Sequence, residues 1–302
     1  MFDGAVHFEI HPAIGIARVG NSPDSYFVGP QQPGNYQPAA GGFKDFGDPE
    51  KGIPPRVKRQ AAEFRIYAYD AEHNILGEVT AADADIVWTV HLANKKAEWD
   101  RFAGTLGENL PLDTRRPRDE WRNSAVDDRD SLIIDAGERR VLNRGDSARF
   151  DTGTFRGRPV YLGEIRTDDS GRLLVLGGHG LSECSNPAGR IVNYANNDLW
   201  HDDTSDGPVT ATVRIRGAMD PVTATPAWAI VAPPDFAPRI DCVVTLFDVA
   251  VDVAKRNPGE LSLPASIGPS VPPSFTADVH PIFARIASLQ WVQQVALERQ
   301  TC

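Results

Sequence analysis

Val209-Thr210-Ala211-Thr212-Val213-Arg214-Ile215 alternates apolar and polar side chains and is rich in β-branched residues. A period of two residues is that of a strand with one buried face, so the stretch predicts a β-strand. It follows Asp206-Gly207-Pro208, which favours a turn, because proline lacks an N–H and cannot continue a helix or a central strand. We therefore expect the strand to begin after that turn.

Other short stretches carry the same signal and are separated by turn residues at fairly even spacing. They lie at 8–20 (broken at Pro12), 64–69, 86–92, 133–140, 160–165, 172–176, 228–231 and 243–249. Many short strands with turns between them favour a mainly β architecture, a sandwich or an open barrel, over βαβ units. A few short helices are expected beside the strands, and residues 94–102 predict a helix or helical turn.

One longer helix is expected near the C-terminal end of the sequence. Apolar residues recur close to the helical period after Pro272-Pro273-Ser274, at Phe275, Val279, Ile282, Phe283 and Ile286, and predict a helix over 275–297. The proline-rich stretch 264–273 is the best candidate for a boundary. We therefore expect a β-rich body over residues 1–263, and a connection with a helical segment over residues 264–302.

The composition is that of an ordinary globular protein, with 41% hydrophobic and 24% charged residues in 302. A net charge of −10 argues against a nucleic-acid or anionic-membrane partner. No apolar run approaches the roughly 20 residues of a membrane span, and no secretory signal is evident. We expect a cytoplasmic protein, or one exported without a recognisable secretory signal. Three cysteines without regular spacing (Cys184, Cys242 and Cys302) predict neither a disulfide framework nor a zinc site.

A polar loop precedes the strand at 209–215, in the run Asn196-Asn197-Asp198-Leu199-Trp200-His201-Asp202-Asp203-Thr204-Ser205. Loops at the mouth of a sheet often carry binding and catalytic groups. The candidates for lining a substrate entrance are Trp200, His201, Asp202 and Asp203, with His201 facing the substrate because a turn does not need it. The alternative is a turn whose aspartates accept hydrogen bonds from backbone amides, a role that suits Asp203 and Asp206.

A further candidate is His179, within Gly177-Gly178-His179-Gly180 after an apolar strand. Glycines let the backbone approach another group closely, and a histidine changes charge near neutrality; a histidine hydrogen-bonded in a turn is the alternative. His11 is expected to be structural. Asp202, Thr204 and Asp206 are spaced like the start of a calcium loop, but Val213 stands where the closing glutamate belongs. No metal site is predicted.

Six blocks, taken in order, carry a family resemblance over nearly the whole chain. They are HPAIGIARVGNS (11–22), KRQAAEFRIY (58–67), VHLANKK (90–96), GGHG (177–180), WHDDTSDGPV (200–209) and IVAPPDFAP (230–238). Together they resemble the N-terminal part of the lysine 6-oxidase and glycine oxidase family, whose enzymes carry a protein-derived cysteine tryptophylquinone. The resemblance implies oxidative deamination of an amino acid or amine by dioxygen, releasing ammonia and hydrogen peroxide.

The members of that family are more than twice as long as this chain. The half that is absent here carries their crosslinked cysteine and tryptophan and their carboxylate base. The resemblance thus implies a companion C-terminal half or chain, a flavoprotein that matures the cofactor, and an isolated chain without activity. Cys184 and Trp200 are the nearest cysteine and tryptophan in sequence, but no motif assigns them to the crosslink. We also expect a homo-oligomer. The alternative function is a non-catalytic binding or assembly module that keeps the family's scaffold.

Overall fold

The computed structural model describes residues 2, 7–30, 42–100, 117–185, 189, 191, 193, 196–234, 236, 242–257 and 272–289. The chain divides into two compact units, of which the first comprises Met1–Gly29 and Pro38–Asp235 and the second Pro30–Gln37 and Phe236–Cys302. Each unit is described by itself. The boundary that the sequence suggests at residue 264 lies outside the described residues and stays a prediction.

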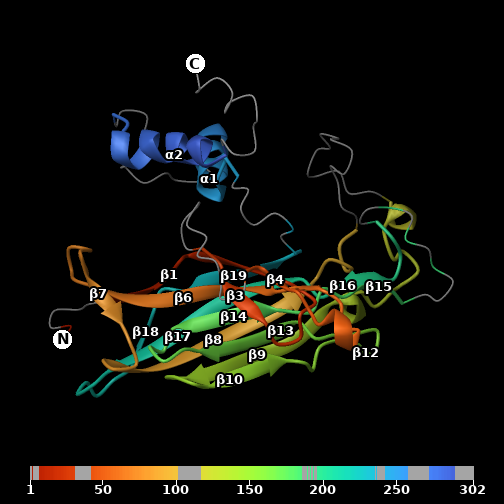
Figure 1. Cartoon of the computed structure of the whole chain (residues 1–302), viewed down its shortest axis with the longest axis horizontal. Coiled ribbons are helices and arrows are strands. Elements are labelled where there is room, and N and C mark those ends of the chain that lie inside the picture. The colour runs from red at the N-terminus through yellow and green to blue at the C-terminus, as the bar shows by residue number, and fades with distance from the viewer. Residues whose placement is uncertain are drawn as a thin grey trace. The chain divides into compact units, whose positions relative to one another are not determined.

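The first unit is made of short and long strands with three single-turn 3₁₀ helices (Figure 1). The strands are β1 (His7–His11), β2 (Ile14–Arg18), β3 (Tyr26–Val28), β4 (Lys44–Asp45), β5 (Arg56–Val57), β6 (Arg59–Tyr69), β7 (Ile75–Val79), β8 (Ala84–Asn94), β9 (Ile134–Leu142), β10 (Ser147–Phe150), β11 (Thr154–Phe155), β12 (Arg158–Pro159), β13 (Gly163–Thr167), β14 (Leu173–Gly177), β15 (Ser182–Cys184), β16 (Trp200–Asp202), β17 (Ser205–Ile215), β18 (Val222–Thr223) and β19 (Ala227–Ala232). The 3₁₀ helices are η1 (Pro49–Lys51), η2 (Arg118–Glu120) and η3 (Arg129–Leu132).

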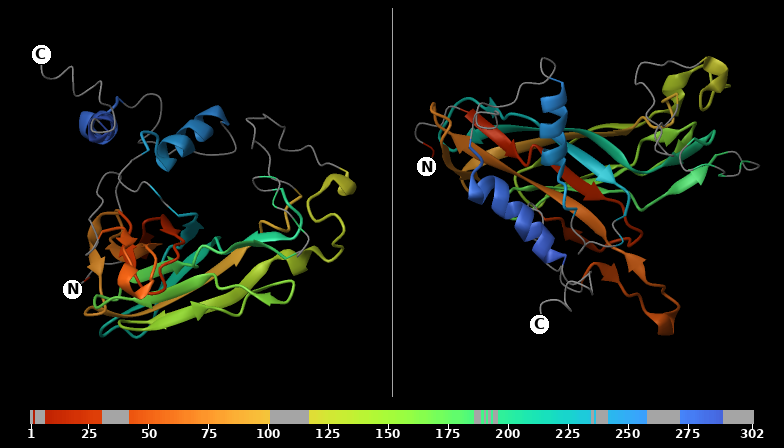
Figure 2. Two further views of the ribbon diagram at one scale, coloured as in Figure 1. Left: turned by 45° about the vertical axis from the view of Figure 1, so that its right-hand side comes forward. Right: turned by 90° about the horizontal axis from the view of Figure 1, so that it is seen from above.

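Most of these strands belong to one sheet of 13 strands, whose main path runs β10-β13-β14-β6-β2-β19-β17-β8-β9. β1, β3 and β7 add to β6, and β18 adds to β17. The pair β2–β19 is parallel, and the other neighbours on the path are antiparallel. The end strands β9 and β10 lie side by side, so the sheet is nearly closed in the manner of a barrel (Figure 2). The predicted mainly β fold is confirmed.

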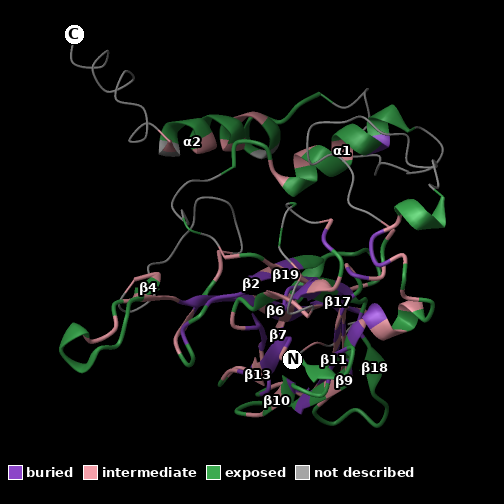
Figure 3. Ribbon diagram, turned by 90° about the vertical axis from the view of Figure 1, so that its right-hand side faces the viewer, coloured by how far each residue is buried: buried purple, intermediate pink, exposed green. Residues whose placement is uncertain are grey.

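The core forms because the long strands bury alternate side chains over much of their length, and β8 does so along all of it. Along β8 every second side chain is buried, at Ala84, Ile86, Trp88, Val90 and Leu92. The buried residues gather within the sheet in Figure 3. Trp88 is fully buried, and its indole N–H donates to the carbonyl oxygen of Gly171 at 2.9 Å. Each large apolar side chain buried in this way contributes about 1.5–3 kcal/mol to stability.

The expected turn at Asp206-Gly207-Pro208 is wrong, since β17 already begins at Ser205 and runs through it. Pairing with β19 continues across these residues, with Gly207 opposite Ala229. Pairing with β8 skips Gly207 and Pro208. The ladder with β8 therefore needs no hydrogen bond from the proline nitrogen, which has no hydrogen to donate. A side chain on Gly207 would place its Cβ 1.7 Å from the carbonyl oxygen of His91. The close approach of β8 therefore requires glycine.

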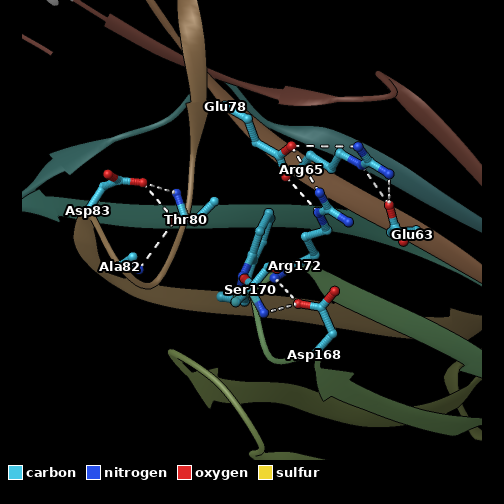
Figure 4. Close-up of polar contacts among 11 residues, drawn as sticks. Glu63, Arg65, Glu78, Thr80, Ala82, Asp83, Asp168, Ser170 and Arg172 are labelled. Carbon is cyan, nitrogen blue, oxygen red and sulfur yellow. Dashed lines mark hydrogen bonds and ion pairs between the residues drawn. The ribbon is translucent and has the colours of Figure 1, made fainter. Parts of the chain in front are cut away.

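Partly buried ion pairs tie β6, β7 and β14 together (Figure 4). Arg172, the residue before β14, donates to both carboxylate oxygens of Glu78 on β7, at 2.6 and 3.1 Å. Arg65 of β6 contacts Glu63 at 2.6 Å and Glu78 at 3.5 Å. In the turn before β14, the Asp168 carboxylate accepts the backbone N–H groups of Ser170 and Arg172 at 2.8 and 2.9 Å. The two-pronged Arg172–Glu78 contact fixes the relative position of two strands that are far apart in sequence.

The second unit contains α1 (Leu246–Arg256), a π-helical turn η5 (Phe275–Val279) and α2 (His280–Ser288). The strand expected at 243–249 is wrong, because Thr245 starts a helix there. The Thr245 hydroxyl accepts the backbone N–H of Asp248 at 3.2 Å, and the Asp248 carboxylate accepts that of Thr245 at 2.7 Å. This reciprocal cap satisfies N–H groups that a helix start leaves open. Local capping therefore overrides the β-branched composition of the segment.

The helix expected over 275–297 is present from Phe275 to Ser288 as a π-helical turn followed by an α-helix, and residues 290–302 lie outside the described part. Pro281 occupies the first turn of α2, where its missing N–H costs no hydrogen bond. The expected helix or helical turn at 94–102 is a turn at residues 96–98, after the end of β8. Within the described residues, every helix is too short or too polar to traverse a lipid bilayer.

Candidate functional site

The acidic loop, defined here as Trp200–Ser205, comprises β16, the two connecting residues Asp203 and Thr204, and the first residue of β17, and it is largely buried. β16 pairs with β15, so that Cys184, Glu183 and Ser182 lie opposite Trp200, His201 and Asp202. His201, Asp202, Asp203, Thr204 and Ser205 are all buried, with His201 and Asp203 only 2% exposed. The sequence suggests a loop at the mouth of a sheet. The structure instead encloses its charged groups in protein.

Asp202 is held by three partners. Its Oδ1 accepts from the side-chain amide of Asn94 at 2.7 Å and from the hydroxyl of Thr204 at 2.8 Å, and its Oδ2 lies 2.7 Å from the ammonium of Lys96. The Lys96 ammonium also contacts the hydroxyl of Thr204. Asn94 ends β8 and Lys96 follows it, so the carboxylate fastens the acidic loop to the neighbouring strand. A carboxylate with this many donors is well satisfied where it lies.

Asp203 lies under the glycine-rich segment 177–180. A Cβ on Gly178 would be 2.3 Å from the Asp203 carboxylate and 2.7 Å from the carbonyl oxygen of Tyr161, which explains why glycine is needed there. Burial raises the pKa of Asp203 to about 6, although backbone hydrogen bonds from Leu181, Gly180 and His179 lower it. The structure thus brings together two motifs, the acidic loop and Gly177–Gly180, that the sequence shows only as separate features.

His201 packs flat against Phe155, with 4.3 Å between ring centroids and 23° between ring planes. Its Nε2 lies 3.5 Å from the Glu183 carboxylate. Burial lowers the pKa of His201, and the nearby Glu183 only partly opposes that effect. The ring is therefore neutral near pH 7, and a stacked neutral imidazole contributes packing in addition to any proton transfer.

Trp200 and His179 are the candidates that remain half-buried. The Trp200 indole N–H donates to the Ser182 hydroxyl at 3.0 Å, and the Lys96 ammonium lies 6.0 Å from the ring centroid. His179 stacks on Tyr161 with 5.0 Å between centroids. Burial, and then the nearby Arg59 guanidinium, lower the pKa of His179. These two aromatic rings are the parts of the candidate site with accessible surface.

A buried ion pair that the sequence reasoning missed lies beside His179. The Arg59 guanidinium, on a residue 1% exposed, donates to Glu164 at 3.1 Å and to the carbonyl oxygen of Gly177 at 3.3 Å. Arg166 contacts the same Glu164 oxygen at 2.6 Å. Asn94 and Lys96 were missed as well, because they precede Asp202 by more than a hundred residues. Their signal in the sequence was membership of the block at 90–96.

Residues 11–231 match the family described as L-Lysine epsilon oxidase N-terminal. The chain belongs to the L-lysine epsilon oxidase N-terminal family. The L-lysine 6-oxidase of Marinomonas mediterranea is 32% identical to it over an alignment 330 positions long, which covers 95% of this chain and 43% of that protein. Crystal structures of the L-Lys epsilon-oxidase from the same organism, and of its Schiff base intermediate with L-Lys, are each 30% identical with a TM-score of 0.69. Each of these matches covers 95% of this chain and 45% of the other.

The resemblance to this family is thereby confirmed, and the chain spans less than half the length of these relatives. All five candidate residues lie within the part that matches the L-lysine epsilon oxidase N-terminal family, whereas β1 lies mostly before it. The family membership makes the chain part of an amino-acid oxidase family. It does not assign a role to any single residue of the acidic loop.

Proposed function

We propose that this chain is the N-terminal portion or a subunit of an amino-acid oxidase that deaminates its substrate with dioxygen and releases ammonia and hydrogen peroxide. The observation that supports this is the match to L-lysine 6-oxidase over 95% of the chain but only 43% of that relative. More than half of the relative has no counterpart here. A companion polypeptide, or a continuation of this one, supplies that half in our proposal.

We place the cysteine tryptophylquinone outside this chain. Strand pairing sets Cys184 opposite Trp200, and this is the pair nearest in sequence. However, the Cys184 thiol donates to the carbonyl oxygen of Asp198 at 3.3 Å, and the Trp200 indole donates to Ser182. The two side chains are engaged separately and do not fit the crosslink. The cofactor and the flavoprotein that matures it are therefore assigned to the companion half.

The acidic loop has a supporting role in this proposal. Trp200 and His179, which are half-buried, would face the substrate entrance. Asp202 and Asp203 would hold the loop in place from within. The role of His201 at the substrate stays a prediction, and its 2% exposure favours support over contact.

The decisive experiment compares the isolated chain with the protein from its natural source. Intact-mass spectrometry of the source material would reveal a companion half, together with any crosslink and added oxygen atoms. Peroxide and ammonia release would be measured for both samples with L-lysine, glycine and other amino acids. We expect activity only where the companion half is present.

Two outcomes would contradict the proposal. Turnover by the isolated chain with a visible quinone absorbance would return the cofactor to Cys184 and Trp200. A source protein with no companion half and no peroxide release would make the chain a binding or assembly module instead.

A further inference from the structure

Three of the seven histidines gather at the end of the sheet formed by β1, β6 and β7. Side chains alternate along a strand, so His7, Glu9 and His11 share the partly exposed face of β1. β1 pairs with β6, placing His7 opposite Tyr69 and Glu9 opposite Tyr67. The turn between β6 and β7 then adds His73. We call His7, Glu9, His11 and His73 the histidine cluster.

The donor atoms of this cluster converge on the Glu9 carboxylate. Its Oε1 lies 3.4 Å from Nε2 of His7 and 3.8 Å from Nε2 of His73. The donor atoms of His7, Glu9 and His73 all lie within 4.8 Å of one another. Neighbouring donors around a tetrahedral zinc ion, with bonds of about 2.0–2.1 Å, are separated by about 3.3 Å. Small side-chain rotations would therefore bring the three donors onto one ion.

The rings are held in place before any ion binds. His7 stacks on Tyr69 and on His73, each with 5.1 Å between centroids. Nε2 of His11 lies 2.8 Å from the Tyr69 hydroxyl, which fixes His11 beside the other three residues of the cluster. The Asp70 carboxylate accepts the backbone N–H of Asn74 at 2.7 Å and shapes the turn. His73 has a φ of 65° in that turn.

The cluster is also reachable from solvent. The side chains of Glu9, His7 and His73 are 23%, 35% and 64% exposed, so an ion could enter and a water molecule could complete its coordination. Two imidazoles and one carboxylate are a donor set that suits Zn²⁺ and neighbouring transition-metal ions, and not Mg²⁺ or Ca²⁺.

We propose that His7, Glu9 and His73 bind one Zn²⁺-class ion, with water in the fourth position and His11 as a positioning residue. The ion would clamp β1 to the β6–β7 turn. The site is separate from the acidic loop and does not rest on the proposed oxidase function. His7 and Glu9 also lie before the residues that match the family.

The test is calorimetric titration of the full chain, free of purification tags and chelators, with ZnCl₂. We expect one ion per chain and an increase in melting temperature with Zn²⁺. Co²⁺ should give the visible absorption of a low-symmetry site. His73→Asn and Glu9→Gln should each weaken binding by about tenfold or more. Asparagine tolerates positive φ, so His73→Asn should keep the metal-free melting temperature of the parent.

The matched control is His91→Asn. His91 also has its Nε2 against a carboxylate, at 2.6 Å from Asp135, and is about one-third exposed, but it has no second histidine in the contact. Its loss should leave Zn²⁺ binding unchanged. Absence of stoichiometric binding would overturn the proposal. Equal binding by the parent, His73→Asn and Glu9→Gln would overturn it too, as would loss of binding after the cysteines are alkylated.

Discussion

His201 and His73 each have Nε2 within 4 Å of a glutamate carboxylate, at 3.5 Å from Glu183 and 3.8 Å from Glu9. The side chain of His201 is 1% exposed and that of His73 is 64% exposed. In the acidic loop, the surrounding protein desolvates the polar groups and supplies Asp202 with three partners. In the histidine cluster, the groups keep surface and face one another. The same residue types therefore act as scaffold in one region and are available to a ligand in the other.

The largest expected effect is that of Asp202→Ala. It leaves the half-buried Lys96 ammonium without its carboxylate at 2.7 Å and removes the acceptor of Asn94. We expect a loss of about 3 kcal/mol in the free energy of unfolding, measured by urea denaturation, because a partly buried charge is left unpaired and the buried Asn94 amide loses its acceptor. Asp85→Ala is the control, since Asp85 pairs with Arg214 at 2.6 Å with both side chains about half exposed. It should cost less than about 1 kcal/mol. Equal losses would remove the contrast between buried and exposed pairs.

Asp203 gives the next effect, which appears as a pH dependence. Burial raises its pKa to about 6, against about 3.9 in an unfolded chain. The native state therefore holds this proton to higher pH than the unfolded state does. Stability consequently falls as the pH rises from about 4 to about 6, and the full penalty of between about 2 and 3 kcal/mol is present above that range.

Asp203→Asn should remove this decline. The measurement is the difference in unfolding free energy between variant and parent at several values of pH from 4 to 7, which cancels the other titrating groups. Asp206→Asn, an exposed carboxylate of β17, is the control and should follow the parent. If the difference between Asp203→Asn and the parent did not change with pH, Asp203 would not be the source of the decline, and its carboxyl would be hydrated in solution.

A smaller loss is expected when a histidine of each region is changed. His201→Ala removes a ring stacked on Phe155 at 4.3 Å and should lower stability by about 2 kcal/mol, near the low end for truncating a large buried side chain. His73→Asn, measured without metal, should stay within about 0.5 kcal/mol of the parent. Thermal and urea unfolding of both variants check this. A large loss for His73→Asn would mean that the histidine cluster is itself part of the scaffold.

The smallest loss that we expect to be measurable is for an ion pair of intermediate exposure. Arg172→Lys keeps the charge but loses one prong of the contact with Glu78, which has distances of 2.6 and 3.1 Å. The loss should be about 1 kcal/mol, because lysine cannot reproduce the fork of a guanidinium. Arg214→Lys, in the exposed pair with Asp85, is the control and should be close to neutral. Equal losses of stability for the two variants would show that the Arg172–Glu78 pair contributes no more than an exposed pair.

Strand periodicity predicted most of the sheet. The stretches at 64–69, 86–92 and 228–231 fall within β6, β8 and β19, because a strand with one buried face must alternate. The prediction of a strand at 243–249 was wrong, because the valine-rich composition indicates a strand while the Thr245–Asp248 cap starts a helix. The prediction of a turn at Asp206-Gly207-Pro208 was wrong, because these residues pair with β19 and the strand continues through them. The local sequence cannot predict that pairing, because β19 lies about twenty residues further along the chain.

The sequence by itself determined the mainly β class and, through six ordered blocks, the family. The alternation of apolar and polar residues and the order of the six blocks depend only on the order of residues along the chain. Only the tertiary structure decided which polar groups are buried. It brought Lys96 to Asp202, Gly178 to Asp203 and His73 to Glu9, across separations that no local pattern records. Burial then sets the pKa of Asp203 and lowers that of His201, since the cost of a charge depends on the dielectric around it.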